Sequence, residues 1–353
     1  GKVDLFVTGE TSFLMPIMNF VFSGVTLLIV WYGAKQVDLG QLQIGDMMAF
    51  MQYAMQIIMS FMMITFMFIM IPRAAVSSKR ILEVLEKPLS ILDPKNPTEF
   101  NHKDTGIVEF NDVSFKYPNA DDYVLKNISF TANKGEMTAI IGSTGSGKST
   151  LINLIPRFYD VTSGSVKVNG QDVREVKQTS LRDRIGYIPQ KALLFSGTIE
   201  SNLKYAKEDA TQEELDKAIE IAQAKNIIQE KAGHYEEPIS QGGTNVSGGQ
   251  KQRLSIARAL VKNPDIYIYD DSFSALDYKT DAALRAALEK DLSDKTLIVV
   301  AQRISTIMNA DQIIVLNDGQ VVGKGTHDEL MDNCEVYREI AFSQLSKEEL
   351  NHE

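Results

Sequence analysis

Two adjacent aspartates follow a short apolar stretch in the segment "IYIYDDSFSALD". The stretch indicates a buried strand, so Asp270 and Asp271 are expected at its end. Two carboxylates at such a place indicate chemistry on a metal-bound phosphate, because Mg²⁺ prefers oxygen ligands. Asp271 is the candidate catalytic residue, and the elements around it decide whether its side chain is long enough for that chemistry.

An earlier glycine-rich segment, "GSTGSGKS", matches the phosphate-binding pattern G-x-x-x-x-G-K-[ST]. It follows the β-rich run "MTAII" and opens a helical pattern, which is the context that the motif requires. Lys148 would place a positive charge against the β- and γ-phosphates, and Ser149 can bind Mg²⁺. The predicted nucleotide-binding residues of this phosphate loop are Gly142, Ser143, Thr144, Gly145, Ser146, Gly147, Lys148, Ser149 and Thr150.

A second loop, in "NVSGGQKQRLSIARAL", also precedes a helix whose apolar positions face a core. The backbone N–H groups of Ser247, Gly248 and Gly249 would form another anion-binding helix start. A serine N-cap followed by two glycines is the simpler alternative. That alternative does not explain the basic first turn, which contains Lys251 and Arg253.

The elements that must position these loops belong to an α/β domain. From Gly106 onward, β-rich runs such as "MTAII", "IYIY" and "LIVVA" alternate with helical patterns, which is typical of a largely parallel sheet. We assign residues 106–353 to this domain. The polar stretch 87–105, which contains three prolines, is interpreted as a linker. The single cysteine, Cys334, fits a reducing cytosol.

Residues 1–86 are interpreted as a membrane segment. Residues 13–34 and 47–71 are apolar runs without a charged residue, and each is long enough for a transmembrane helix. Buried core helices are the alternative, but such helices are usually shorter than these runs. Basic residues follow the second run, so the positive-inside rule places that end in the cytoplasm. These basic residues are Arg73, Lys79 and Arg80.

Methionines recur at helical spacing within the second apolar run. They suit either a surface that accommodates varied apolar ligands or lipid contact and helix packing. The formal net charge of −10 argues against a nucleic-acid partner, because proteins that bind the phosphate backbone are usually basic.

Six motifs in order, "GSTGSGKS", "YIPQ", "VSGGQKQRLSIARAL", "YIYDD", "SALD" and "AQRIST", resemble the ATPase domain of an ABC transporter. The preceding "WYGAKQV", "AFMQYAMQI" and "RAAVSSKRILEVLE" resemble the last two membrane helices and connecting helix of an ABC exporter half. The resemblance implies an α-helical transmembrane segment followed by an α/β P-loop ABC ATPase domain. Such exporters have further membrane helices, so we interpret the chain as an N-terminally truncated half-transporter.

The resemblance implies further residue roles and two cofactors, ATP and Mg²⁺. Tyr117 resembles the aromatic that stacks on adenine, although a plain strand tyrosine is the alternative. Gln190 resembles the glutamine that senses Mg²⁺ and the γ-phosphate, and Asp270 would hold Mg²⁺ through water beside Ser149. The signature loop would reach across a head-to-tail dimer to the partner's ATP. It consists of Ser247, Gly248, Gly249 and Gln250.

Two departures from the family pattern concern catalysis. Asp271 stands where the family has a glutamate, and a positioning error of about 1 Å can cost on the order of a hundredfold in rate. Gln302 stands where the family has a histidine, and glutamine cannot carry the positive charge of an imidazolium. The signature loop is nearly intact, with Val246 in place of a leucine. This asymmetry resembles the subunit with the degenerate site in a heterodimeric bacterial multidrug exporter.

Three functions are therefore compared. The first is a plasma-membrane subunit that pairs with a second half-transporter to export hydrophobic or amphipathic small molecules, with its ATPase domain in the cytoplasm. The second is a catalytically competent homodimeric exporter of lipid or peptide. The third, a soluble ABC ATPase that acts on nucleic acid, is disfavoured by the apolar runs and the net charge of −10.

Overall fold

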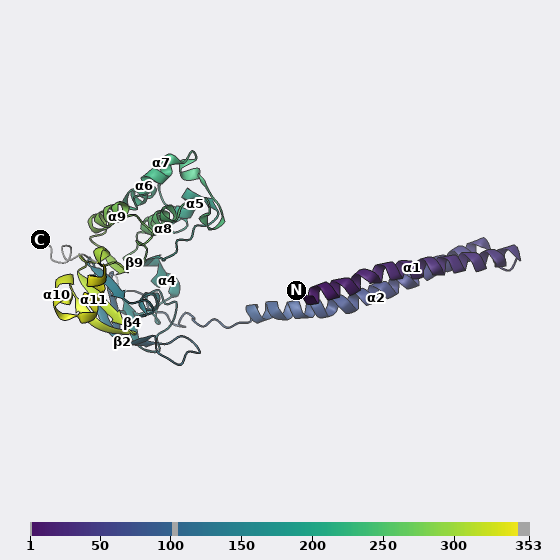
Figure 1. Ribbon diagram of the computed structural model, residues 1–353, viewed down its shortest axis with the longest axis horizontal. Helices are drawn as coiled ribbons and strands as arrows, with labels where there is room; N and C mark the ends of the chain where they lie inside the picture. The colour runs from purple at the N-terminus through teal and green to yellow at the C-terminus, as the bar shows by residue number, and fades with distance from the viewer. Residues whose placement is uncertain (1, 101–104, 345–353) are drawn as a thin grey trace. The chain divides into compact units, whose positions relative to one another are not determined.

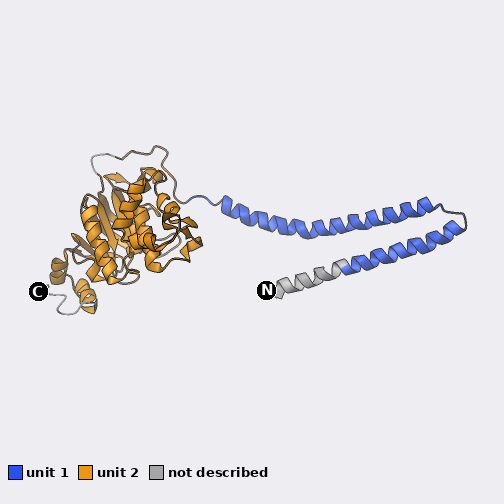
Figure 2. Cartoon of the chain, turned by 90° about the horizontal axis from the view of Figure 1, so that it is seen from above, with its two compact units in different colours: residues 1–89 blue, residues 90–353 orange. Residues whose placement is uncertain are grey.

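The chain divides into two compact units, residues 1–89 and 90–353 (Figure 2). The computed structural model describes the backbone of residues 2–100 and 105–344, and the side chains of residues 16–100 and 105–344. Each unit is described by itself.

The first unit consists of two long helices, α1 (Lys2–Asp38) and α2 (Ile44–Leu85), which are joined by a short turn (Figures 1 and 2). Gly40 adopts a positive φ of 71° in the turn between them. Near the turn the helices pack closely, since a Cβ on Gly33 would lie 2.8 Å from the Met47 side chain. By length and composition, Pro16–Asp38 and α2 are each able to cross a membrane, and their most apolar 18-residue stretches have mean hydropathies of 1.7 and 2.2.

The second unit contains two main sheets. The larger has six strands in the order β12-β11-β3-β10-β9-β6, with β12 antiparallel at one edge and all other pairs parallel. Its strands are β3 (Met137–Gly142), β6 (Ile185–Ile188), β9 (Ile266–Asp270), β10 (Thr296–Val300), β11 (Gln312–Asn317) and β12 (Gln320–Gly325). The α/β domain with a largely parallel sheet, predicted from the alternation of elements, is confirmed.

The smaller main sheet is antiparallel, in the order β2-β1-β4-β5. It contains β1 (Val108–Phe115), β2 (Leu125–Ala132), β4 (Ser163–Val168) and β5 (Gln171–Asp172). A two-stranded ribbon pairs β7 (Gly197–Thr198) with β8 (Pro238–Ile239). The helices of this unit are α3 (Lys148–Asn153), α4 (Gln178–Asp183), α5 (Ile199–Lys204), α6 (Gln212–Ile221), α7 (Lys225–Glu230), α8 (Gly248–Lys262), α9 (Tyr278–Asp291), α10 (His327–Asn333) and α11 (Glu335–Gln344).

Alternating side chains of the six-stranded sheet feed two separate cores. On β9, Ile266 and Ile268 pack into one core, whereas Tyr267 and Tyr269 pack into the other, and all four are fully buried. This alternation follows from the period of two residues in a strand. Because both faces are covered, the central strands are apolar throughout, as expected for parallel strands.

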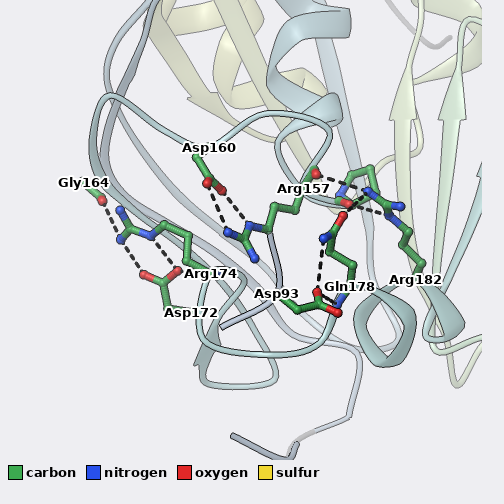
Figure 3. Close-up of polar contacts among 9 residues, drawn as sticks. Asp93, Arg157, Asp160, Gly164, Asp172, Arg174, Gln178 and Arg182 are labelled. Atoms are coloured by element: carbon green, nitrogen blue, oxygen red, sulfur yellow. Dashed lines mark hydrogen bonds and ion pairs between the residues drawn. The ribbon is translucent and has the colours of Figure 1, made fainter. Parts of the chain in front are cut away.

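The start of the second unit is fastened to α4 by polar contacts (Figure 3). Asp93 accepts hydrogen bonds from the backbone N and from Nε2 of Gln178, at 2.9 and 3.1 Å. Arg182 donates to Gln178 Oε1 at 3.1 Å and to the carbonyl oxygen of Pro156 at 3.1 Å. An ion pair between Arg157 and Asp160 lies nearby. A second ion pair joins Arg174 to Asp172, and Arg174 also donates to the carbonyl oxygen of Gly164. Asp93, within the predicted linker, is thereby held against the rest of the second unit.

The strand order determines which loops meet. β3, β10, β9 and β6 are neighbours and run parallel, so their carboxyl ends lie at one edge of the sheet. In open α/β sheets this edge is where ligands bind. The phosphate loop, Gln302, the aspartate pair and Gln190 each follow one of these four strands.

Candidate functional site

The glycines of the phosphate loop are required by its geometry. A Cβ on Gly142 would collide with the carbonyl oxygen of Leu316 on the neighbouring strand β11. Gly147 has a φ of 99°, and its Cβ would lie 2.8 Å from the Leu125 side chain. Gly145 has a φ of 85° and open space around it. The backbone of the loop is therefore closely packed at Gly142 and Gly147 and accessible at Gly145, as a phosphate-binding loop requires.

Lys148 is folded back into the phosphate loop. Its Nζ donates hydrogen bonds to the carbonyl oxygens of Gly142 and Ser143, both at 2.8 Å. Burial lowers the pKa of Lys148, and the nearby carboxylates of Asp271 and Asp270 oppose this shift. The ammonium group thus lies at the phosphate loop, and phosphate oxygens could replace the two carbonyl oxygens as its hydrogen-bond acceptors.

The loop also contains a buried hydroxyl without a partner. Ser146 is 2% exposed, and its Oγ makes no hydrogen bond with the described residues. Because buried polar atoms in folded proteins are nearly always satisfied, this donor fits a loop that is completed by a phosphate group.

Asp270, the predicted Mg²⁺ residue, lies beside Ser149. Its Oδ1 accepts a hydrogen bond from Ser149 Oγ at 3.0 Å, and its Oδ2 lies 3.2 Å from the hydroxyl of Tyr187. The same hydroxyl lies 3.0 Å from Asn153 Oδ1 at the end of α3. Burial raises the pKa of Asp270, and the hydrogen bonds from Ser149 and Tyr187 oppose that shift. No role was predicted for Tyr187, whose contact with Asp270 depends on the pairing of β6 with β9.

Asp271 is held by both predicted glutamines. Its Oδ2 accepts hydrogen bonds from Nε2 of Gln190 at 2.9 Å and from Nε2 of Gln302 at 2.6 Å. Gln190 therefore contacts Asp271, and among the described residues no hydrogen bond joins it to Asp270. The strand order brings together three residues that are far apart in the sequence.

The backbone of Asp271 is unusual and firmly fixed. Its φ is 50°, a left-handed value that is uncommon for a residue other than glycine. The N–H of Asp271 donates to the carbonyl oxygen of Val300 at 2.9 Å, and the carbonyl oxygen of Asp271 accepts from Ser274 Oγ at 2.8 Å. Such strain is typical of functional sites. Burial also raises the pKa of the Asp271 carboxyl, against the hydrogen bond from Gln190.

The raised pKa predicts that Asp271 destabilises the nucleotide-free fold at neutral pH. The folded state binds this proton more tightly than the unfolded state, so stability falls as pH rises from 3.8 through the folded pKa. Asp271→Asn removes the charge, keeps an acceptor oxygen and suits a left-handed φ better. We expect its melting temperature at pH 7 to rise by about 1–3 °C.

Asp277→Asn is the matched control. Asp277 caps α9 by accepting hydrogen bonds from the backbone N and the hydroxyl of Thr280, which lower its pKa. Its replacement should therefore leave the melting temperature at pH 7 unchanged or lower it. A lower melting temperature for Asp271→Asn would contradict the electrostatic explanation.

Tyr117 lies next to the helix that follows the phosphate loop. Its hydroxyl is 2.9 Å from Oγ1 of Thr150. Its ring packs edge-on against Phe115 and Tyr159, with centroid distances of 5.0 and 5.2 Å. The side chain is half-buried, so the predicted adenine-stacking residue stands beside the phosphate loop.

The signature loop is separate from the phosphate loop in this chain. Ser247 caps α8: its Oγ accepts from the backbone N of Gln250, and Gln250 Oε1 accepts from the backbone N of Ser247 at 3.0 Å. Among the described residues, no hydrogen bond joins residues 247–250 to residues 142–150. α8 packs against α5 and α6 (Figure 1). The start of α8 is thus capped by its own side chains, and anion binding there stays a prediction.

The donor set around Ser149 and Asp270 suits Mg²⁺ that arrives with a nucleotide. In the part of the chain that the structure describes, no group of three or more His, Cys, Asp or Glu side chains could hold a metal ion. Mg²⁺ commonly uses one or two carboxylates together with substrate phosphates and water. A hydroxyl and one carboxylate at the phosphate loop meet that requirement.

Comparison with known proteins agrees with this geometry. Residues 125–274 match the ABC transporter family. An uncharacterized ABC transporter ATP-binding protein of Mycobacterium tuberculosis is 44% identical over 336 residues, which are 94% of this chain and 57% of that protein. A Bacillus subtilis protein named "Putative multidrug export ATP-binding/permease protein" is 37% identical, over 92% of this chain and 56% of that protein.

A solved structure extends the likeness to both units. The structure of a bacterial Atm1-family ABC exporter with ATP bound matches with a TM-score of 0.75 and 32% identity, over 94% of this chain and 57% of that one. The chain thus spans 56–57% of the length of each of these three proteins. It belongs to the ABC transporter family and joins an N-terminal helical segment to an ABC ATPase domain in the fold of an Atm1-family exporter.

Proposed function

We propose that this chain is the ATP-binding, membrane-spanning subunit of an ABC exporter and that its own ATP site is degenerate. Its signature loop would complete the competent site of a second half-transporter. The observation that carries this proposal is the cluster at Asp271, where one carboxylate oxygen accepts hydrogen bonds from both Gln190 and Gln302.

The site residues receive the following roles in this proposal. Tyr117 stacks on adenine, the phosphate loop binds the phosphates, and Lys148 exchanges its two carbonyl partners for phosphate oxygens. Ser149 and Asp270 hold Mg²⁺, which neutralises charge on the phosphates when it is bound. Gln190, which contacts Asp271 here, would help to hold the ion and the γ-phosphate.

Degeneracy follows from reach and charge. Asp271 is one methylene shorter than a glutamate, and its fixed backbone cannot move outward to compensate. Gln302 offers the γ-phosphate a neutral amide, whereas an imidazolium would also stabilise the developing negative charge. An attacking water at this site would thus lie farther from its base and beside a weaker electrostatic partner.

The membrane role rests on the helical unit. α1 and α2 would cross the plasma membrane, and the basic residues near the end of α2 would place the ATPase domain in the cytoplasm. Exported compounds would be hydrophobic or amphipathic. The likeness to a relative named for multidrug export and the exposed methionines of α2 support this substrate class.

ATP hydrolysis by the full-length chain without a partner tests the proposal. We expect the parent to be nearly silent and the double variant Asp271→Glu with Gln302→His to gain on the order of a hundredfold in turnover, because the base regains its reach. Adding Lys148→Met to the double variant should abolish that gain. Brisk hydrolysis by the parent would instead favour a competent homodimeric exporter of lipid or peptide.

A further inference from the structure

The helix α11 contacts the loop that carries Gln302. This loop, residues 301–305 (the Gln302 loop), follows β10. Gln344, the last residue of α11, donates from Nε2 to the carbonyl oxygen of Gln302 at 2.7 Å. The Oε1 atom of Gln344 accepts from the backbone N of Ile304 at 2.9 Å. One side-chain amide thus contacts the backbone on both sides of Arg303.

The buried face of α11 explains why Gln344 reaches this loop. Tyr337 and Ala341 are fully buried and lie in the same core as Ile304. Gln344 follows Tyr337 by seven residues and Ala341 by three, so all three share one face of the helix. The hydroxyl of Tyr337 also lies 2.8 Å from Nδ1 of His327 at the start of α10. Packing therefore fixes α11 with Gln344 at the Gln302 loop.

Other elements hold the two ends of the Gln302 loop. At its first end, the backbone N of Ala301 donates to a carbonyl oxygen of β3 at 3.2 Å. At its far end, Arg285 of α9 donates from Nη1 to the carbonyl oxygen of Ser305 at 2.9 Å. Among the described residues, Gln344 is the one donor to the carbonyl oxygen of Gln302. Removal of Gln344 would therefore release the middle of the loop and leave its ends in place.

The position of the Gln302 side chain depends on this backbone. Nε2 of Gln302 donates to Oδ2 of Asp271 at 2.6 Å. Because both ends of the loop are fixed, a rotation of the peptide group after Gln302 must be shared by the backbone around it, and the Cα–Cβ bond of Gln302 turns with that backbone. Gln344 opposes such a rotation with two hydrogen bonds.

We propose that Gln344 is a positioning residue that fixes Gln302 for its contact with the γ-phosphate of the chain's own ATP. This inference rests on the proposed function, in which Gln302 offers the γ-phosphate a neutral amide. The helix α11 is then part of the ATP site although it does not contact the nucleotide. Loss of the Gln344 contacts weakens the interaction with the γ-phosphate and leaves the contacts to the rest of the nucleotide intact.

The affinity for an ATP analogue relative to ADP isolates the γ-phosphate. Calorimetric titration of the full-length chain compares ADP with AMP-PNP, which has a γ-phosphoryl group that is not hydrolysed, both with Mg²⁺. Methionine keeps the length of Gln344 but has no amide, and Gln344 is exposed, so Gln344→Met should leave the fold intact. We expect this variant to bind AMP-PNP about threefold to tenfold more weakly, the size of one hydrogen bond, and to bind ADP like wild type. A merely structural role would weaken the binding of both nucleotides.

A double variant shows whether Gln344 acts through Gln302. If it does, Gln302→Ala with Gln344→Met binds AMP-PNP no more weakly than Gln302→Ala alone, because both changes remove one contribution. Multiplicative losses, or an equal loss for ADP, would overturn the proposal. Ser343→Ala is the matched control, since Ser343 is the exposed neighbour of Gln344 and its Oγ donates to the carbonyl oxygen of Ile340 within α11. It should bind both nucleotides like wild type.

Gln344→Glu separates the two hydrogen bonds of the amide. Glutamate keeps an acceptor for the backbone N of Ile304, but it loses the donor to the carbonyl oxygen of Gln302 and sets a negative charge against that oxygen. We expect Gln344→Glu to weaken AMP-PNP binding at least as much as Gln344→Met. Wild-type binding of AMP-PNP by Gln344→Glu would overturn the proposal, because the contact with Gln302 would then be dispensable.

These measurements are separate from the test of the proposed function, because they follow binding and degeneracy is judged by hydrolysis. Brisk hydrolysis by the parent would reject the degenerate site and leave an observed effect of Gln344 intact. If Gln302→Ala binds AMP-PNP like wild type, the γ-phosphate contact of Gln302 is rejected, and this inference with it. If Gln302→Ala binds AMP-PNP more weakly but Gln344→Met does not, this inference alone is rejected.

Discussion

Lys148→Met is expected to weaken MgATP binding on the order of a hundredfold, about 2.7 kcal/mol. Nζ of Lys148 donates to two carbonyl oxygens of the phosphate loop, both at 2.8 Å. Its ammonium group would interact with the phosphates of a bound nucleotide. Methionine keeps the length of the side chain but offers phosphate oxygens neither charge nor donor. Hydrogen bonds that involve charged groups are worth more than neutral ones, about 1.5–3 kcal/mol each. Titration with a fluorescent ATP analogue measures the loss.

The controls separate charge from geometry. Lys148→Arg keeps the charge but replaces a compact ammonium by a planar group, and the two are not interchangeable at a fitted site. We expect it to recover less than a tenth of the lost affinity. Lys217→Met removes an exposed lysine on α6 and should bind like wild type. An unchanged affinity in Lys148→Met would mean that the loop does not bind phosphate through this side chain.

Local sequence predicted those parts of the site that depend on neighbouring residues. The glycines and lysine of the phosphate loop are adjacent in the chain, and their spacing follows from the conformation of one loop. The position of Asp270 at the end of a buried strand follows from the apolar run before it, and β9 ends at Asp270. The helix start at Ser247 was visible for the same reason, and its capping contacts are present.

The contacts that depend on strand order could not be predicted in this way. Gln190 and Gln302 donate to one oxygen of Asp271 because β6, β9 and β10 are neighbours in the sheet. That order depends on pairing between strands that are far apart in the sequence. The same holds for Tyr187, whose hydroxyl reaches Asp270 across the β6–β9 pair. Family resemblance supplied roles for both glutamines, but not their shared partner.

Gln252 shows a different limit of sequence reasoning. In the helical pattern of α8 it occupies a buried position, where an apolar side chain would be expected. A buried glutamine signals that some polar partner exists, but the partner here is a carbonyl oxygen 63 residues earlier in the chain. Only the packing of α8 against the loop 189–195 identifies it.

Gly142→Ala is expected to destabilise the ATPase domain by about 3 kcal/mol and to lower its melting temperature by about 6–12 °C. The new Cβ would collide with the carbonyl oxygen of Leu316 and would lie 2.7 Å from Ser146 Oγ. Leu316 belongs to β11, which pairs with β3 in parallel at this residue, so relief requires opening the sheet where the phosphate loop begins. Thermal unfolding of the purified chain measures the change.

Gly145→Ala distinguishes this collision from backbone strain. Gly145 has a φ of 85° and no atom within 4 Å of an added Cβ, so alanine there meets the left-handed cost of about 1–2 kcal/mol but no neighbour. Gly142 has no positive φ, so its cost comes from packing against β11 and Ser146 Oγ. We therefore expect the larger loss of stability at Gly142. Equal losses in the two variants would assign the requirement for glycine to backbone conformation rather than to the contact between the phosphate loop and the sheet.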